Sequence, residues 1–139
     1  MIEETSAGIV IFRKEESKKL FLLLHYPSGH WDFVKGKMEK GESTHQTAIR
    51  EAKEETGITD ITFVENFEEW IEYNFKHQGE LVQKKVVFFL AETKTKEVKI
   101  SHEHSGYTWM DYNEAMEKTT FNNAKTVLTK AQKLLSDTL

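Results

Sequence analysis

The residues of this sequence best suited to metal or acid–base chemistry lie within residues 36–58. Glu51, Glu54 and Glu55 stand there at positions i, i+3 and i+4, which places their side chains on one face of an α-helix. Like charges so placed destabilise a helix by roughly 0.2–0.5 kcal/mol per pair, so a bound divalent cation is the simplest physical reason to cluster them. Carboxylate oxygens favour Mg²⁺, for which Mn²⁺ can substitute.

Signals for both ends of the required helix flank these glutamates. Ser43 and Gln46 match a capping box, in which each side chain bonds the backbone N–H of the other residue. Gly57 allows the left-handed backbone conformation that ends many helices. The sequence therefore predicts a helix over residues 43–56. A solvated acidic face is the alternative explanation for the three glutamates alone, and the spacing of the residues around them decides between the two.

That spacing resembles the Nudix box, G-x5-E-x7-R-E-U-x-E-E-x-G-U, where U is an apolar residue. The segment reads G-K-M-E-K-G-E-S-T-H-Q-T-A-I-R-E-A-K-E-E-T-G-I. It matches the box at Gly36, Glu42, Arg50, Glu51, Glu54, Glu55, Gly57 and Ile58. The one soft position is Ala52, where the family usually has a larger aliphatic residue, and we expect the smaller side chain to loosen the packing of helix against sheet.

The resemblance implies an α-β-α sandwich with a mixed central β-sheet, an α/β (α+β) fold. It also implies hydrolysis of a phosphoanhydride in a nucleoside diphosphate derivative. Glu51, Glu54 and Glu55 become metal ligands, and Glu51 and Glu54 are catalytic candidates together with Arg50. Arg50 and Glu42 are expected to orient the loop and the helix through charge-assisted hydrogen bonds.

Three stretches outside the box resemble the asymmetrically cleaving diadenosine tetraphosphate hydrolases. They are Gly29-His30-Trp31-Asp32-Phe33, residues 84–92, and Ser101-His102-Glu103-His104 followed by Tyr107 and Trp109. The resemblance spans nearly the whole chain and implies cleavage of diadenosine tetraphosphate to ATP and AMP. In that group the S-H-E-H stretch contributes a glutamate near the metals. Glu103 is therefore a fourth metal ligand candidate and a possible general base, with an ordinary loop carboxylate as the alternative.

One departure from the group precedes the box, where relatives usually have W-x-x-P-K-G. Here Val34 replaces the proline. Without the ring, φ is free and an additional N–H must be satisfied, so the loop is expected to be less rigid. No charge or ligand is lost by this replacement.

Local cations must hold an anionic substrate, because the chain's formal net charge is −4. Lys35, Lys37, Lys84 and Lys85 are the candidates, and solvated surface is the alternative for each. The resemblance to the diadenosine tetraphosphate hydrolases implies that His30 donates a hydrogen bond to a phosphate, with a turn histidine as the alternative.

Tyr73 and Phe121 are the aromatic residues expected to stack on a nucleotide base, and packing at the rim of the core is the alternative. The three tryptophans, Trp31, Trp70 and Trp109, are expected to pack instead. The histidines His45, His102 and His104 lack the compact spacing of zinc motifs, so the sequence predicts no zinc site.

Hydrophobic patterning predicts the elements that position these side chains. Branched and aromatic residues predict strands at residues 5–13, 19–25, 61–64, 67–75, 84–92 and 107–110, the first two as a hairpin, with a turn at Gly79. A helix at residues 122–135 has an apolar stripe of Ala124, Val127, Leu128, Ala131, Leu134 and Leu135. One helix is therefore expected on either side of a mixed sheet.

Length and composition predict one compact domain over residues 1–139, which the resemblance implies is a Nudix domain. The sequence has no cysteine, which excludes disulfides and thiolate zinc sites and fits the cytoplasm. No apolar run reaches the roughly 18 residues of a membrane span, and no signal sequence is recognised. The expected partner is a small nucleoside polyphosphate, with no membrane or stable nucleic-acid partner, and the protein is expected to be a monomer.

Two other functions stay open at this point. Another Nudix pyrophosphohydrolase, acting on RNA 5′ ends or nucleoside triphosphates, would share every residue of the box. A non-catalytic nucleotide sensor would keep the fold but is expected to have lost metal carboxylates, whereas Glu51, Glu54 and Glu55 are all present here.

Overall fold

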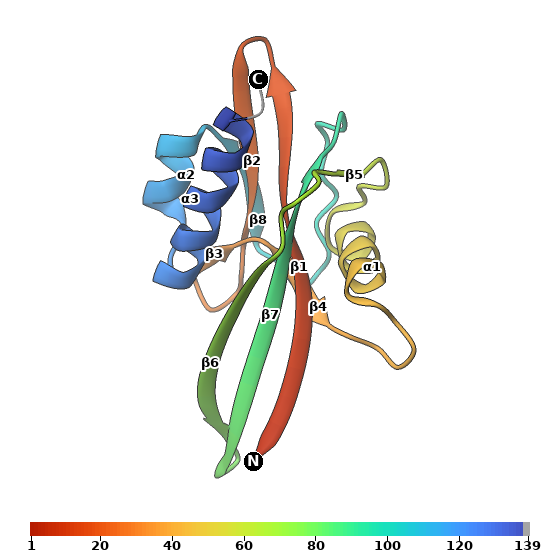
Figure 1. Cartoon of the computed structure of the whole chain (residues 1–139), viewed down its shortest axis with the longest axis vertical. Helices are drawn as coiled ribbons and strands as arrows, with labels where there is room; N and C mark the ends of the chain where they lie inside the picture. Colours follow the sequence, from red (N-terminus) through yellow and green to blue (C-terminus); the bar gives the residue numbers. More distant parts are fainter. Residues whose placement is uncertain (138–139) are drawn as a thin grey trace.

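A computed structural model describes residues 1–137 as one mixed sheet with helices on both faces (Figure 1). The strands are β1 (Ile2–Glu15), β2 (Lys18–His25), β3 (Trp31–Asp32), β4 (Val34–Lys37), β5 (Thr62–Phe63), β6 (Glu69–His77), β7 (Glu80–Glu92) and β8 (Gly106–Met110). The helices are α1 (Thr44–Thr56), α2 (Tyr112–Lys118) and α3 (Asn122–Asp137). The predicted α-β-α sandwich with a mixed sheet is confirmed.

Strand β1 is the centre of the sheet. It pairs with β7 in parallel along most of its length, and with β2 and β4 antiparallel. β6 and β7 form the predicted hairpin, and Gln78 and Gly79 at its turn have φ of 51° and 81°, as two-residue hairpin turns require. The parallel pairing brings residues near 5 and near 85 side by side, far apart though they are in sequence.

Each face of the sheet has its own hydrophobic core, because successive side chains of a strand point to opposite faces. Val10 and Phe12 of β1 join the core beneath α2 and α3. Ile9 and Ile11 join the core beneath α1. The apolar stripe predicted for the last helix is confirmed, since its residues are buried in the first core or, for Leu134, packed against it.

The sequence patterns missed α2, and they placed the start of β6 two residues too early. Helix α2 has only seven residues and one buried side chain, Ala115, so it shows no apolar periodicity. Its start is marked by Asp111, which accepts the Glu114 N–H at 2.9 Å. β6 does not begin at Phe67. This residue directly follows Asn66, which has a φ of 67° in a turn, and the ring of Phe67 packs into the core.

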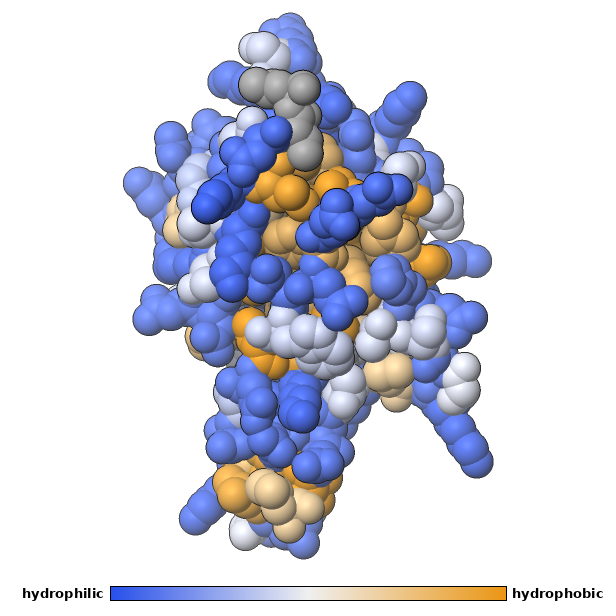
Figure 2. All heavy atoms as spheres, viewed as in Figure 1, coloured by the Kyte–Doolittle hydropathy of each residue, from blue (hydrophilic) through white to orange (hydrophobic). Residues whose placement is uncertain are grey.

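The β6–β7 hairpin and the start of β1 extend beyond the helices as a narrow arm (Figure 1). Apolar side chains gather at the end of this arm (Figure 2), where Met1, Ile2, Phe75 and Leu81 are exposed. No helix within residues 1–137 combines the length and the apolar character needed to cross a membrane.

Candidate active site

Helix α1 begins and ends as its sequence predicts. The Ser43 Oγ accepts the Gln46 N–H at 3.1 Å, and the Gln46 Oε1 accepts the Ser43 N–H at 2.8 Å. At the other end Gly57 has φ of 76°, and its N–H donates to the Lys53 carbonyl at 2.9 Å. These caps fix the helix limits and therefore the direction in which its carboxylates point.

Arg50 connects α1 to the loop before it. Its Nε donates to Glu42 Oε2 at 2.6 Å, and its Nη1 donates to Glu51 at 2.8 Å and Glu54 at 3.1 Å. Nη2 donates to the Lys37 carbonyl at 2.9 Å. The bond from Arg50 lowers the pKa of Glu42 to about 2. The orienting role predicted for Arg50 and Glu42 agrees with these contacts.

Gly36 lets Glu51 approach strand β4 closely. A Cβ atom at position 36 would lie 2.1 Å from the Cδ of Glu51, which is far inside van der Waals contact. Gly36 does not have a positive φ, so the need for glycine here is space and not backbone conformation. The first glycine of the box therefore sets the position of the first acidic residue of the helix.

Glu55 is buried beside other acidic residues. Burial and, to a smaller extent, the nearby Glu51 and Glu103 raise its pKa to about 10. One of its oxygens, Oε2, is buried without a hydrogen-bond partner. His104 Nε2 lies 3.0 Å from the other oxygen but outside hydrogen-bond geometry. Burial lowers the pKa of His104, so at neutral pH the imidazole carries no positive charge that would favour the ionised form of Glu55.

The acidic side chains fit a divalent cation. A cation would satisfy the unpartnered oxygen of Glu55 and offset its repulsion from Glu51 and Glu103, and carboxylate oxygens are ligands of Mg²⁺ and Mn²⁺. Within residues 1–137 no three acidic or histidine side chains converge as a complete ligand group. Glu54 instead points to Arg50, and its side chain is 56% exposed.

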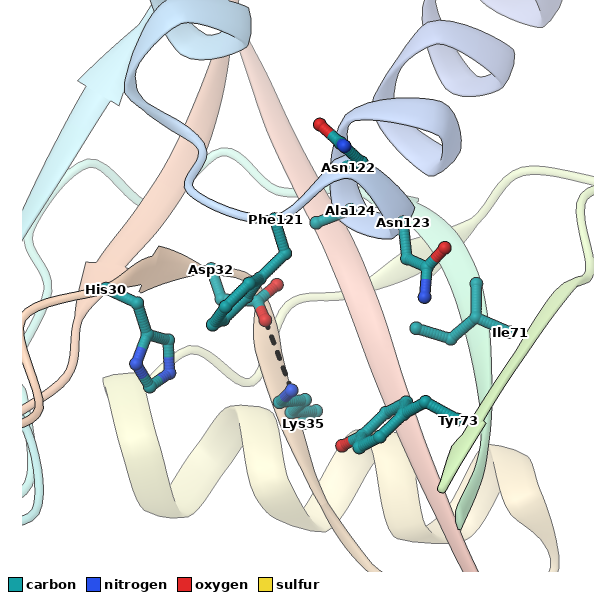
Figure 3. A pocket seen from close by; sticks show the side chains of 9 residues that line it. All are labelled: His30, Asp32, Lys35, Ile71, Tyr73, Phe121, Asn122, Asn123 and Ala124. Carbon is teal, nitrogen blue, oxygen red and sulfur yellow. Dashed lines mark ion pairs between the residues drawn. The ribbon is translucent and has the colours of Figure 1, made fainter. Parts of the chain in front are cut away.

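A cavity of about 520 Å³ lies on the face of β4 that points away from Glu51 and α1 (Figure 3). Its lining residues come from three distant segments: His30, Asp32, Lys35, Ile71, Tyr73, Phe121, Asn122, Asn123 and Ala124. In Figure 3 the rings of Phe121 and Tyr73 enter this space from different elements. The Lys35 ammonium is held 3.1 Å from the Asp32 carboxylate, which is buried. The cavity therefore combines aromatic walls with a fixed cation.

His30 lies between the cavity and the half-buried side chain of Tyr26. Its ring stacks on Tyr26 with centroids 4.6 Å apart and lies 5.1 Å from the ring of Phe121. Burial lowers the pKa of His30, and its Nδ1 lies 2.6 Å from the Ser28 hydroxyl. When Nδ1 accepts from Ser28, the neutral ring carries its proton on Nε2, which can donate to a ligand.

The four candidate lysines separate into two groups. Lys37 and Lys84 both pair with Glu4, at 3.1 and 3.4 Å, and Lys35 is near enough to lower the pKa of Lys84, although burial lowers it most. Lys84 is paired with Tyr73 across the sheet, so it lies on the cavity face. Lys85 is the next residue of the same strand and faces the other way. The structure thus brings three of the four lysines together.

The model of the NUDIX domain matches residues 3–131 of this sequence. The chain belongs to the Nudix family. It is similar to the bis(5′-nucleosyl)-tetraphosphatase [asymmetrical] of Sus scrofa, with 36% identity over 94% of each chain. The enzyme of the same name from Caenorhabditis elegans is 35% identical, over 94% of this chain and 96% of the relative.

Solved structures agree with this Nudix assignment. A structure of a C. elegans Ap4A hydrolase binary complex is similar with a TM-score of 0.81 and 33% identity, covering 96% of this chain and 98% of the other. The Escherichia coli dihydroneopterin triphosphate pyrophosphohydrolase has a TM-score of 0.77 at 20% identity, covering 94% and 97%, which shows a shared fold. The predicted family and fold are confirmed.

Some side chains at the Nudix site had no signal in the sequence. Tyr26 is one, since its hydroxyl donates to the Phe33 carbonyl at 2.6 Å and its ring contacts both His30 and His104. Burial raises the pKa of Tyr26, with nearby carboxylates adding to the effect, so the phenol stays protonated. Asp32 is another, because nothing in sequence shows that its carboxylate lies buried under Lys35.

The remaining aromatic side chains behave mainly as packing. Trp31 stacks on His25 at 4.4 Å between ring centroids, with the Lys118 ammonium 4.7 Å from its centroid. Trp109 donates to the Lys96 carbonyl at 2.9 Å and packs against the core under α1. Trp70 is the exception among the three tryptophans, at 49% exposed.

Proposed function

We propose that this Nudix hydrolase cleaves diadenosine tetraphosphate asymmetrically, giving ATP and AMP. The proposal rests on the way successive residues of β4 face opposite sides of the sheet. Lys35 lines the cavity, and the next residue, Gly36, faces Glu51 of α1. A polyphosphate chain that passes the edge of β4 can therefore reach both groups at once. The activity that their names give to the relatives from S. scrofa and C. elegans supports the same substrate.

In this proposal the cavity binds one adenosine and the adjoining phosphates. Tyr73 and Phe121 hold the adenine ring by stacking. The Nε2–H of His30 and the ammonium of Lys35 donate to phosphate oxygens. Lys37 and Lys84 supply further positive charge along the same face. Lys85 lies on the opposite face of β7 and does not contribute to this cavity.

The chemistry takes place on the acidic side. Glu51, Glu54, Glu55 and Glu103 would hold Mg²⁺, which Mn²⁺ can replace, and such an ion lowers the pKa of bound water and offsets charge on the phosphoryl group. The water oxygen forms a bond to the phosphorus of one outer phosphate, the bond from that phosphorus to its bridging oxygen breaks, and ATP leaves. Glu103 accepts the proton of the water, and Arg50 positions Glu51 and Glu54.

Several expectations from the sequence stay predictions. They are a single Nudix domain over residues 1–139, a monomer, a cytoplasmic location, and the absence of a membrane or stable nucleic-acid partner. Size-exclusion chromatography with light scattering tests the monomer, for which the expected mass is 16.2 kDa.

Product analysis tests the proposed substrate. The pure protein with Mg²⁺ is incubated with diadenosine polyphosphates, triphosphorylated RNA and nucleoside triphosphates, and the products are separated by chromatography. The proposal predicts that diadenosine tetraphosphate has the highest kcat/KM and yields equal amounts of ATP and AMP. Two molecules of ADP, or a higher kcat/KM for RNA or a triphosphate, would overturn it.

A further inference from the structure

Asn123 is a polar side chain at the edge of the proposed adenine site. It lies in the first turn of α3, two residues after Phe121, and lines the same cavity. Figure 3 shows its amide pointing into the space bounded by Phe121, Ile71 and Tyr73. We propose that the Asn123 amide reads the edge of the adenine ring and so selects adenine over other bases, an inference that rests on the proposed function of the cavity.

The amide of Asn123 is free to bind a ligand. It makes no hydrogen bond or ion pair to any residue within 1–137. The carboxylate of Asp32, which lines the same cavity, is already engaged: one oxygen accepts the Phe33 N–H at 2.7 Å and the other pairs with Lys35 at 3.1 Å. Tyr73, Phe121 and Ile71 supply faces for stacking and apolar contact. Of the two asparagines that line the cavity, Asn123 is the one whose free donor and acceptor point into the space between the rings.

Adenine has a matching pair of groups on its edge. Its 6-amino group donates, and the neighbouring ring nitrogen on either side accepts. An asparagine amide offers one acceptor and one donor in the same plane, and bidentate pairing of this kind is the usual way in which asparagine or glutamine recognises adenine. Stacking alone tolerates any base, because every base has an aromatic face. Asn123 therefore adds the discrimination that Tyr73 and Phe121 do not provide.

Asn122 is a matched control within the same turn. It has the same side chain and is exposed in the same way, but Figure 3 shows its amide pointing away from the space between the rings. If base preference depends on an amide that points between the rings, replacing Asn122 leaves the preference unchanged, whereas replacing Asn123 removes it.

The test compares two nucleotides that differ in one group. ADP and the diphosphate of purine riboside, which lacks the 6-amino group, are titrated by calorimetry without divalent metal into the parent, Asn123→Leu, Asn123→Asp and Asn122→Leu. The parent and Asn122→Leu are expected to bind ADP at least about fivefold more tightly than the purine analogue. Asn123→Leu is expected to bind the two nucleotides about equally, because ADP loses two hydrogen bonds and the analogue loses only the one to its ring nitrogen.

Asn123→Asp guards against a folding artefact, because an acidic residue in the first turn stabilises a helix. Its carboxylate still accepts from the 6-amino group but repels the ring nitrogen that both nucleotides share, so both are expected to bind less tightly while ADP remains preferred. Equal weakening of both nucleotides in Asn123→Leu, an unchanged preference in that variant, or a parent without preference would overturn the inference. These titrations need no turnover, so failure to cleave diadenosine tetraphosphate would refute the proposed function without deciding the role of Asn123.

Discussion

The two faces of strand β4 are built in different ways. On the side of α1, one guanidinium binds four acceptor groups, and Glu51 touches a position where even a methyl group would not fit. On the other side, a cavity of about 520 Å³ is open to solvent and lined by rings that face free space. The acidic side of β4 therefore holds carboxylates in fixed positions, whereas the aromatic side leaves room for a ligand.

This comparison predicts different kinetic effects on the two sides. Changes on the acidic side should lower the rate of the chemical step and leave substrate binding nearly intact. Changes in the cavity should weaken binding and leave the chemical step nearly intact, since stacking is similar in the ground and transition states.

Glu54→Gln is expected to have the largest effect. It removes the charge of a proposed metal ligand and keeps its shape, so kcat should fall roughly a thousandfold, because a metal ion supplies several kcal/mol of transition-state stabilisation. The free energy of unfolding should change by only about 0.5 kcal/mol, since the ion pair with Arg50 is largely exposed. Steady-state kinetics and urea unfolding measure the two quantities.

Glu39→Gln is the matched control for that change. Glu39 also pairs with Arg50, at 3.2 Å, and its side chain is 61% exposed, but it is not a proposed metal ligand. We expect its kcat to stay within about twofold of the parent. Equal losses in the Glu39 and Glu54 variants would mean that the substitutions act through Arg50 and not through a metal.

Gly36→Ala is expected to displace Glu51. The added methyl group would overlap the carboxylate, while the backbone of Gly36 tolerates alanine. We predict a roughly ten- to hundredfold fall in kcat, as for other changes that shift metal ligands. Gly106→Ala is the control, because a Cβ atom at position 106 would lie 3.9 Å from the Cβ of His25, its nearest neighbour. Parent-like kinetics of Gly36→Ala would show that the position of Glu51 does not matter.

Tyr73→Ala and Phe121→Ala test the cavity. Each should raise KM for diadenosine tetraphosphate about five- to a hundredfold, because base stacking contributes roughly 1–3 kcal/mol per aromatic ring. The effect on kcat should be smaller. Phe121 is 47% exposed, so its loss should cost little stability, and thermal denaturation checks this point. Variants that melt lower but keep the parent KM would show that the rings serve packing.

The smallest effect concerns the stability of the loop before α1. Arg50 lowers the pKa of Glu42 from 4.5 to about 2, so the folded state holds the ionised form more tightly than the unfolded state does. This contribution is present above about pH 4.5 and is lost as the pH falls towards 2. Parent and Glu42→Gln should therefore differ in unfolding free energy at pH 7, and the difference should shrink on acidification. A difference independent of pH would refute the interpretation.

The acidic side could be predicted from the sequence because its contacts are local. Ser43 and Gln46 are three residues apart at the start of α1, so helix geometry brings them together, and Glu42 and Arg50 are eight apart, so the short loop before α1 needs only to fold back on the helix. The expectation that Ala52 loosens packing has no support, since Ala52 is fully buried on the face of α1 that packs against the sheet. A small side chain there fits a helix that lies close to the sheet.

The cavity could not be predicted in the same way. Lys35, Tyr73 and Asn123 meet only through the parallel pairing of β1 with β7 and the return of α3, neither of which has a local signal. Position in the sequence and family resemblance indicated Tyr73 and Phe121 as stacking residues, whereas no feature of the sequence indicated Asn123. Lys84 and Lys85 show a different error, because the alternation of a strand already separates two adjacent residues.

Single-turnover kinetics with excess protein can show whether the acidic face of β4 serves the chemical step and the cavity serves binding. They give the dissociation constant and the rate of the chemical step separately. Diadenosine tetraphosphate and Mg²⁺ are mixed with parent, Glu54→Gln and Phe121→Ala. The two-sided account predicts that Glu54→Gln slows the chemical step by orders of magnitude and changes the dissociation constant little, whereas Phe121→Ala does the reverse. Both variants changing the same parameter would contradict it.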